Sequence, residues 1–180
     1  CMAKEEQNCS GGLMKADVDD VAVEDELDSD LVLEGTLVCA LTGEHKTSNP
    51  QEETLQSFIE QLHREYAVDL SDMERDVRVE CITGEEGGRA EKKTRSVQLA
   101  VYEHGKPHDV DNMIRAVLVA KPGTKADQKA IALLEEVLGG IAPERDRVFG
   151  LWTNGADLTF RMREYHKRTG DPQFTELTDF

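Results

Sequence analysis

Two stretches of the sequence gather side chains that could do chemistry. In the first, His104 and His108 are followed closely by Asp109 and Asp111. Imidazole and carboxylate groups at such short spacing can bind a metal cation. Because Pro107 and the polar surroundings favour a solvated loop, we expect a surface connection here and no metal centre.

The second stretch is basic. Arg161, Arg163, Lys167 and Arg168 lie within eight positions, with His166 among them. Such a cluster suits a phosphate backbone, so we expect weak nucleic-acid contacts at these four cations. The same side chains could instead pair with the acidic segment of their own chain.

Other signatures argue against a cofactor. Gly123-Thr124-Lys125 lacks both the upstream glycine and the Gly-Lys-Ser/Thr ending of a phosphate-binding loop. The four cysteines contain no C-x-x-C pair, so a zinc site is not expected. Cys39 and Cys81 lie in apolar, strand-like runs and are interpreted as buried thiols. We therefore expect no cofactor and no structural metal.

The elements that must position these residues follow from periodicity and local signals. Asn49-Pro50 begins a helix whose apolar residues recur at helical spacing. Asn154-Gly155 indicates a tight hairpin. The complete expectation is strands over 31–41, 76–82, 94–102, 113–120, 147–152 and 157–163, helices over 50–66 and 126–138, a stop at Gly139-Gly140, and a short segment over 174–177. This order predicts a mixed central sheet flanked by helices, in the α/β or α+β class.

Composition divides the chain unevenly. Its 180 residues include 37 acidic and 21 basic ones, for a net charge of −16, which argues against a freestanding nucleic-acid binder. Residues 1–31 carry ten acids and two lysines. The run from Asp17 to Asp30 has too little apolar surface to offset its ordering entropy. We expect an acidic flexible tail over 1–31 and one folded domain over 32–180.

No apolar run reaches the roughly 18 residues that a membrane helix needs, and no secretion signal opens the sequence. We therefore expect a soluble, cytoplasmic protein that does not bind membranes. The sequence leaves its oligomeric state open.

The order helix, three strands, helix and hairpin resembles the restriction-endonuclease-like fold with a PD-(D/E)xK site. More narrowly, it is similar to the amino-terminal domain of type I restriction enzyme R subunits and of adenine-specific DNA methylases. Lys121-Pro122-Gly123 and Trp152-Thr153-Asn154-Gly155 are the most specific matches. The matching segments are 42–43, 50–53, 97–102, 117–123, 150–155 and 171–179, so the likeness spans about 35–180. It implies one domain of a longer restriction-modification or methylase-type protein.

The resemblance also assigns chemistry to positions. The family holds a divalent cation with an aspartate on one strand and a glutamate on the next, and a lysine two residues later activates water. Here those positions fall on Gln98, Leu118 and Ala120, which have lost the required groups. Residues i and i+2 share a strand face, so Lys121 cannot replace the family lysine. Glu52 and Lys121 are possible remnants.

Three hypotheses follow. The favoured one is a catalytically degenerate domain that acts as a structural or interaction module, with a protein partner or a linked methylase or restriction domain and at most weak DNA contact. The second is an active Mg²⁺-dependent endonuclease with a rearranged site, using Glu52, Glu80 or Glu103 with Lys121. The third is an acidic decoy that regulates a DNA-binding partner through residues 1–31.

Overall fold

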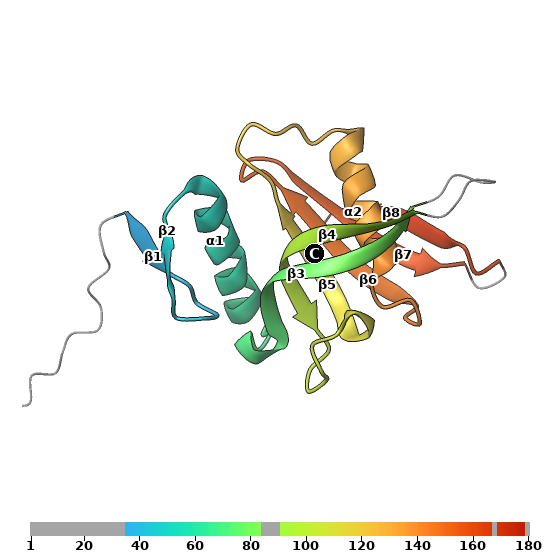
Figure 1. The fold of residues 1–180 in the computed structure, drawn as a ribbon, viewed down its shortest axis with the longest axis horizontal. Coiled ribbons are helices and arrows are strands. Elements are labelled where there is room, and N and C mark those ends of the chain that lie inside the picture. Colours follow the sequence, from blue (N-terminus) through green and yellow to red (C-terminus); the bar gives the residue numbers. More distant parts are fainter. Residues whose placement is uncertain (1–34, 84–90, 167–168, 179–180) are drawn as a thin grey trace, which may run out of the picture. The chain divides into compact units, whose positions relative to one another are not determined.

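The computed structural model describes residues 35–83, 91–166 and 169–178, all within the unit Val32–Phe180 (Figure 1). Its elements are, in order, β1 (Thr36–Val38), β2 (His45–Thr47), α1 (Pro50–Arg64), the 3₁₀ turn η1 (Leu70–Asp72), β3 (Met73–Thr83), β4 (Glu91–Tyr102), the 3₁₀ turn η2 (Val110–Asn112), β5 (Met113–Val119), α2 (Gln128–Gly140), β6 (Arg147–Thr153), β7 (Leu158–Tyr165) and β8 (Pro172–Leu177).

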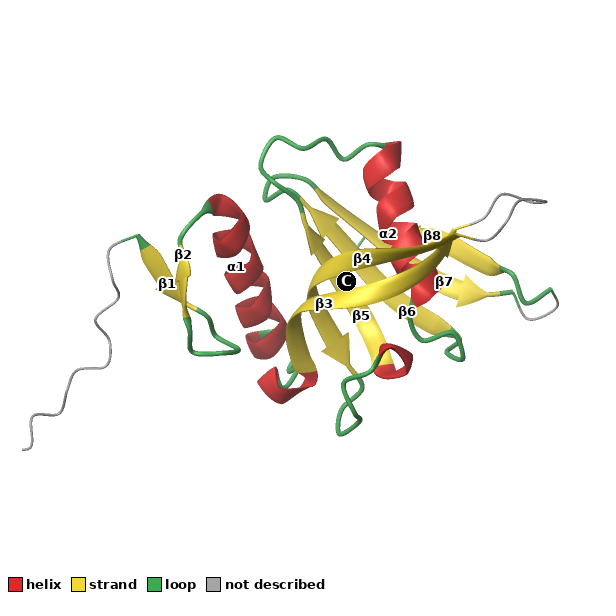
Figure 2. Ribbon diagram, viewed as in Figure 1, coloured by secondary structure: helices red, strands yellow, loops and turns green. Residues whose placement is uncertain are grey.

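The main sheet has six strands in the order β3-β4-β5-β6-β7-β8 (Figure 2). Its central pair, β5 and β6, is parallel, because α2 forms the crossover between them. Every other neighbouring pair is antiparallel. The described residues thus form a mixed α/β fold with two helices, which confirms the predicted class.

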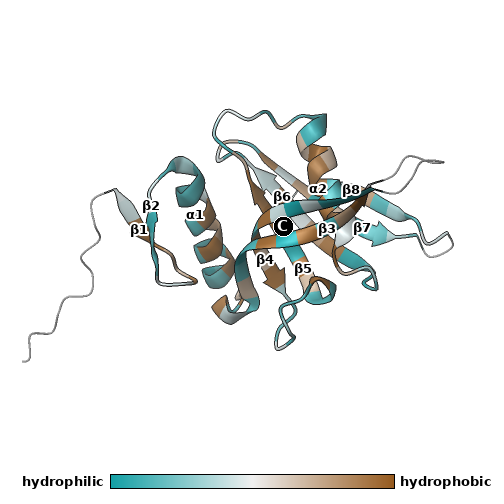
Figure 3. Ribbon diagram, in the orientation of Figure 1, coloured by the Kyte–Doolittle hydropathy of each residue, from teal (hydrophilic) through white to brown (hydrophobic). Residues whose placement is uncertain are grey.

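Each helix covers one face of this sheet. On β5, Ala116 and Leu118 pack with the apolar side of α2, whereas Val117 and Val119 pack with that of α1. We call these the α2 face and the α1 face. Figure 3 shows apolar residues on the central strands and on the side of α1 that faces them. A strand covered on both faces should read as a continuous apolar run, as β5 does.

Local signals fix the ends of α1 and of the β6–β7 hairpin. The Asn49 side chain accepts hydrogen bonds from the backbone N–H groups of Gln51 and Glu52, so α1 begins at Pro50 as predicted. In the hairpin, Asn154 Oδ1 accepts from two backbone N–H groups, and Gly155 has φ +90°. Glycine tolerates that conformation without strain.

Two glycines let α2 lie close to the sheet. A Cβ atom at Gly140 would come within 2.8 Å of the Glu80 carbonyl oxygen, and one at Gly150 within 2.8 Å of Leu134. The predicted helix stop at Gly139-Gly140 was wrong by two residues, since α2 ends at Gly140. The absence of a side chain at Gly140 allows the last turn of the helix to approach β3.

Other boundaries differ from the sequence-based expectation. The predicted strand over 31–41 is, within its described part, only β1, which pairs with the unpredicted strand β2 in a separate sheet. Glu91–Lys93, expected to be loop, belongs to β4. The segment 174–177 belongs to a sixth strand, β8. These strands depend on cross-strand partners, which local patterns do not reveal.

Candidate functional site

The position that the resemblance assigns to the family aspartate lies at an irregularity in two strands. Val97 packs on the α2 face and Leu99 on the α1 face, so β4 changes sides at Gln98. Opposite it, Asp76 interrupts β3 with φ 57°. Regular alternation would place residues two apart on the same face. Gln98 therefore occupies a bend of the β3–β4 ribbon.

The Gln98 side chain completes the backbone hydrogen bonding of β5. The regular β4–β5 ladder includes Leu99 opposite Val117. At the end of β5, the Val119 N–H donates instead to Gln98 Oε1, at 3.0 Å. The Val119 carbonyl accepts from Gln51 Nε2, at 2.5 Å. Two neutral amides thus close the end of β5, one from β4 and one from the first turn of α1.

The residues that the resemblance assigns to the family glutamate and lysine, Leu118 and Ala120, contribute to core packing. Leu118 is 4% exposed within the core of the α2 face. Ala120, two residues later, packs against the same core, as the i, i+2 relation predicts. It borders an apolar groove of about 420 Å³ together with Trp152 and Leu133. A methyl group and a leucine side chain carry no ligand atom for a cation.

These residues do not fit the divalent cation that the resemblance implies. Mg²⁺ binds carboxylate oxygens in near-octahedral geometry. Gln98 supplies a neutral oxygen that already accepts from Val119, and Leu118 and Ala120 supply none. Among the described residues, no group of three or more His, Cys, Asp or Glu side chains is placed to hold a metal ion.

Glu52 takes part in a nearly buried ionic cluster on the α1 face. Its carboxylate accepts two hydrogen bonds from Arg75, at 2.5 and 2.8 Å, and a third from Gln56 Nε2, at 2.8 Å. The side chains of Glu52 and Arg75 are only 12% and 9% exposed. The Arg75 guanidinium outweighs desolvation and holds the pKa of Glu52 below its ordinary value.

Cys39 belongs to the same cluster. Its Sγ lies 3.2 Å from Arg75 Nη1, and the residue is 1% exposed. Burial opposes ionisation of the thiol, but hydrogen bonds from Thr42, Gln56 and Arg75 outweigh it and lower the pKa of Cys39 to about 7. The interpretation of Cys39 as a buried thiol is confirmed, and its electrostatic setting is an addition from the structure.

The carboxylates of the rearranged-nuclease hypothesis are dispersed. Glu52 lies on α1 and pairs with Arg75. Glu80 lies on β3 and pairs with Lys92, and Glu103 follows β4 and pairs with Arg145. Lys121 is exposed beyond the end of β5. Each carboxylate thus has its own cationic partner, and the structure does not bring the three together.

The predicted basic cluster needs a correction at Arg163. This side chain is fully buried, and its guanidinium donates to the carbonyl oxygens of Leu138, Ile141, Ala142 and Arg145 at 2.6–3.1 Å. It therefore caps the end of α2 and is not part of an exposed basic surface.

The other members of that cluster differ from one another. Arg161 is 12% exposed at its side chain and lies between the carboxylates of Glu135 and Glu176. Lys167 and Arg168 lie outside the described residues, as does the acidic segment 1–31. Contacts of these segments with DNA or with each other stay predictions.

The two histidines of the 104–111 stretch face different partners. His104 Nδ1 is 2.7 Å from Asp72 Oδ2. His108 lies 3.3 Å from Glu74 and stacks on Tyr102, with ring centroids 4.3 Å apart. The Asp109 side chain accepts from the Asn112 N–H and begins η2. These imidazoles are thus not directed at a common cation.

Sequence reasoning missed Arg75 and Gln51. Arg75 precedes the strand predicted over 76–82, so the alternating pattern did not include it, although it belongs to β3. Its glutamate lies 23 residues earlier, and no local pattern links the two. Gln51 could not be singled out, because its acceptor at Val119 is 68 residues away.

The chain matches no protein-family model, no curated protein and no solved structure. Among the described residues, no helix has the length and apolar character required to cross a membrane.

Proposed function

We propose that this unit is a restriction-endonuclease-like domain that has lost nuclease chemistry. It serves as a structural or interaction module of a restriction-modification or DNA-methylase-type protein. The order of elements, a helix, three strands, a helix and a hairpin around one mixed sheet, supports this proposal. The partner is another protein or a covalently linked methylase or restriction domain.

The observation that carries the proposal is the hydrogen bond from the Val119 N–H to Gln98 Oε1. A nuclease needs a free carboxylate at this position. Here the side chain replaces a backbone ladder bond where β4 and β5 separate, and Leu118 fills the core beside it. An aspartate is one methylene shorter, so it would hold the strands less well. The residues are thus suited to maintaining the fold and not to binding a cation.

The charges also favour weak or indirect DNA contact. Arg163 is buried, and Arg161 lies between two carboxylates. The chain as a whole carries a net charge of −16. Binding to a phosphate backbone depends on free cations that release counterions.

A cleavage assay tests the proposal. The full chain is incubated with Mg²⁺ or Mn²⁺ and with single-stranded, double-stranded or methylated DNA. We expect no cleavage above a control with EDTA. Cleavage that Glu52→Gln abolishes would contradict the proposal and support the rearranged nuclease.

Calorimetry with Mn²⁺ provides an independent readout. Gln98→Ala is compared with Gln61→Ala, because Gln61 is an exposed glutamine of α1 that bonds to Glu65. We expect the same Mn²⁺ affinity in both variants and in the unsubstituted chain. A Mn²⁺ complex that is lost only in Gln98→Ala would overturn the proposal.

A further inference from the structure

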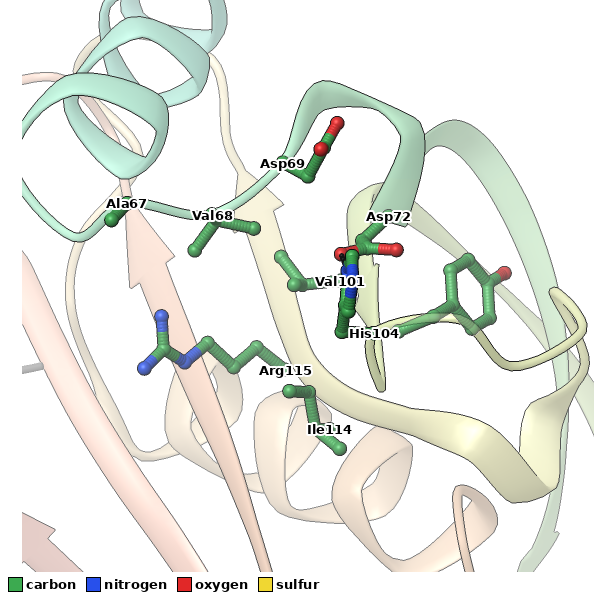
Figure 4. A pocket seen from close by; sticks show the side chains of 9 residues that line it. Ala67, Val68, Asp69, Asp72, Val101, His104, Ile114 and Arg115 are labelled. Carbon is green, nitrogen blue, oxygen red and sulfur yellow. Dashed lines mark hydrogen bonds and ion pairs between the residues drawn. The ribbon is translucent and has the colours of Figure 1, made fainter.

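A pocket of about 390 Å³ opens on the α1 face, between the segment that follows α1 and the strand β5 (Figure 4). Val68, Val101 and Ile114 form its apolar wall; Val101 belongs to the core of the α1 face, and the half-buried Val68 and Ile114 pack against that core. The volume lies at the lower end of the range for small-molecule sites. The pocket therefore has room for a ligand the size of one substituted ring.

An oriented histidine lies at the rim of the pocket. His104 Nδ1 donates to Asp72 Oδ2 at 2.7 Å, and the Asp72 side chain is 11% exposed. The His104 side chain is 82% exposed. Because Nδ1 is bonded to the carboxylate, Nε2 is the nitrogen available to a ligand. The hydrogen bond and charge of Asp72 raise the pKa of His104, which increases the fraction that can donate from both nitrogens.

Arg115 supplies a second cation. Figure 4 shows its side chain extending from β5, with the guanidinium and the His104 ring on either side of Val101 in that view. Desolvation lowers the pKa of Arg115, yet arginine stays charged in proteins. Arg115 also interacts with another group of the fold. Its five N–H donors allow a further acceptor.

The carboxylates near the pocket already have partners. Asp69 accepts from the backbone N–H and the hydroxyl of Ser71, at 2.9 and 2.8 Å. Asp72 is bonded to His104. His104 and Arg115 border an apolar wall, where an anion gains most from a charge-assisted hydrogen bond.

We propose that this pocket binds a small organic carboxylate, with its apolar body against Val68, Val101 and Ile114 and its carboxylate on Arg115. A planar carboxylate matches the guanidinium fork, which can bond to both oxygens. His104 Nε2 donates to a polar group at the open end of the ligand. The proposal is independent of whether the domain cleaves DNA.

The test uses benzoate as the probe and benzamide as its uncharged isostere, with ¹H–¹⁵N spectra of the full chain recorded during titration. We expect saturable shifts of the Val68, Val101 and Ile114 amides with benzoate, and about 10- to 100-fold weaker binding of benzamide. Acetate, which lacks the apolar body, should also bind more weakly. Equal affinity for benzoate and benzamide, or no saturable shift with benzoate, would overturn the proposal.

Variants identify the groups responsible. Arg115→Met keeps the apolar stem of the side chain but removes the guanidinium, and it should weaken benzoate binding about 10- to 100-fold, while Arg115→Lys should recover part of the affinity. Arg64→Met is the matched control, because Arg64 is exposed and pairs with Glu60. Benzoate binding that is unchanged in folded Arg115→Met contradicts the proposal.

His104→Gln keeps the proposal testable if Arg115→Met does not fold, because this side chain is largely exposed. 4-Hydroxybenzoate, whose hydroxyl lies at the opposite end of the ring from the carboxylate, is then the probe. We expect weaker 4-hydroxybenzoate binding in His104→Gln than in the unsubstituted chain. Equal binding, or phenyl phosphate binding more tightly than either carboxylate, would contradict the proposed ligand.

Discussion

On the α2 face of the sheet, the buried guanidinium of Arg163 donates hydrogen bonds to four backbone carbonyls and lies over the Tyr165 ring, 4.4 Å from its centroid. On the α1 face, Arg75, Glu52 and Cys39 form an ionic cluster, and Arg115 borders a pocket. The α2 face uses its fully buried guanidinium to end a helix, and its ion pair Arg95–Glu136, which joins β4 to α2, is more exposed than Glu52–Arg75. The α1 face uses nearly buried charges to join three elements and places Arg115 at the border of a pocket.

The two described cysteines illustrate the same difference. Burial on the α2 face raises the pKa of Cys81 to about 11. On the α1 face, hydrogen bonds outweigh burial and lower the pKa of Cys39 to about 7. Both residues are at most 1% exposed. Two equally buried thiols therefore differ in pKa because only Cys39 accepts hydrogen bonds strong enough to outweigh its burial.

The largest expected effect is on the α2 face. Arg163→Met should lower the free energy of unfolding by about 3–5 kcal/mol, because it leaves several buried carbonyls without a donor. Urea unfolding followed by circular dichroism measures this change. Arg161→Met is the control, with an expected loss of about 1 kcal/mol or less, because its two partners are more exposed. Equal losses for Arg163→Met and Arg161→Met would contradict the prediction that the buried guanidinium of Arg163 stabilises the fold more than the ion pairs of Arg161.

Breaking the ionic cluster should have the next largest effect. Glu52→Gln is expected to cost about 2 kcal/mol at pH 7, between the values for exposed and buried pairs. The folded-state pKa of Glu52 is lowered. Its stabilisation is therefore present above the ordinary glutamate pKa and is lost as the pH falls through the lowered value.

Urea midpoints measured from neutral to acidic pH test this expectation. The natural sequence and Glu52→Gln should converge in acid. Glu60→Gln serves as the control, because Glu60 pairs with Arg64 at 3.9 Å on an exposed surface. A difference for Glu52→Gln that stays constant with pH would show that ionisation of Glu52 contributes nothing.

A smaller effect is expected at the end of β5, where Gln98 bonds to Val119. Gln98→Ala removes the acceptor for the Val119 N–H and should cost about 1 kcal/mol. Gln98→Asp should not restore the loss, because its carboxylate is one methylene shorter. Thermal unfolding compares both variants with Gln61→Ala. Full stability of Gln98→Asp would indicate that this position accepts a carboxylate.

The smallest expected effect concerns His104, whose pKa Asp72 raises. The stabilisation from this pair is present below the ordinary histidine pKa, about 6.5, and is lost as the pH rises through the raised value. The stability difference between the unsubstituted chain and His104→Gln should therefore shrink in alkaline solution, because only the neutral Nδ1–H then bonds to Asp72. A ¹H NMR titration should give His104 a higher pKa in the unsubstituted chain than in the Asp72→Asn variant. Identical values would contradict the pairing.

Sequence patterns predicted the elements with strong local signals. The Asn49-Pro50 cap, the apolar run of β5 and the Asn154-Gly155 turn each act within a few residues. β2 and the first residues of β4 are polar and depend on their neighbouring strands. Arg163 was assigned to a basic surface because its acceptors, in and after α2, are 18 to 25 residues away.

The surroundings of the candidate positions could be predicted only in part. The sequence alone gives the residue types at Gln98, Leu118 and Ala120, and the assignment of a lost cation site to them stays a prediction. The contacts that those residues make could be identified only from the structure, because they depend on the course of the backbone. The bend at Gln98 and the partnership of Glu52 with Arg75 arise from the packing of separate strands and α1.

The double closure at Val119 also bears on the order of folding. Its N–H and its carbonyl are bonded to side chains 21 and 68 residues away along the chain. Contacts between distant residues form late, because the intervening chain must first lose conformational entropy. In pulse-labelled refolding, the Val119 amide should therefore gain protection after the amides in the middle of α2. Protection of this amide would report the moment at which Gln98 of β4 is in place beside the end of β5.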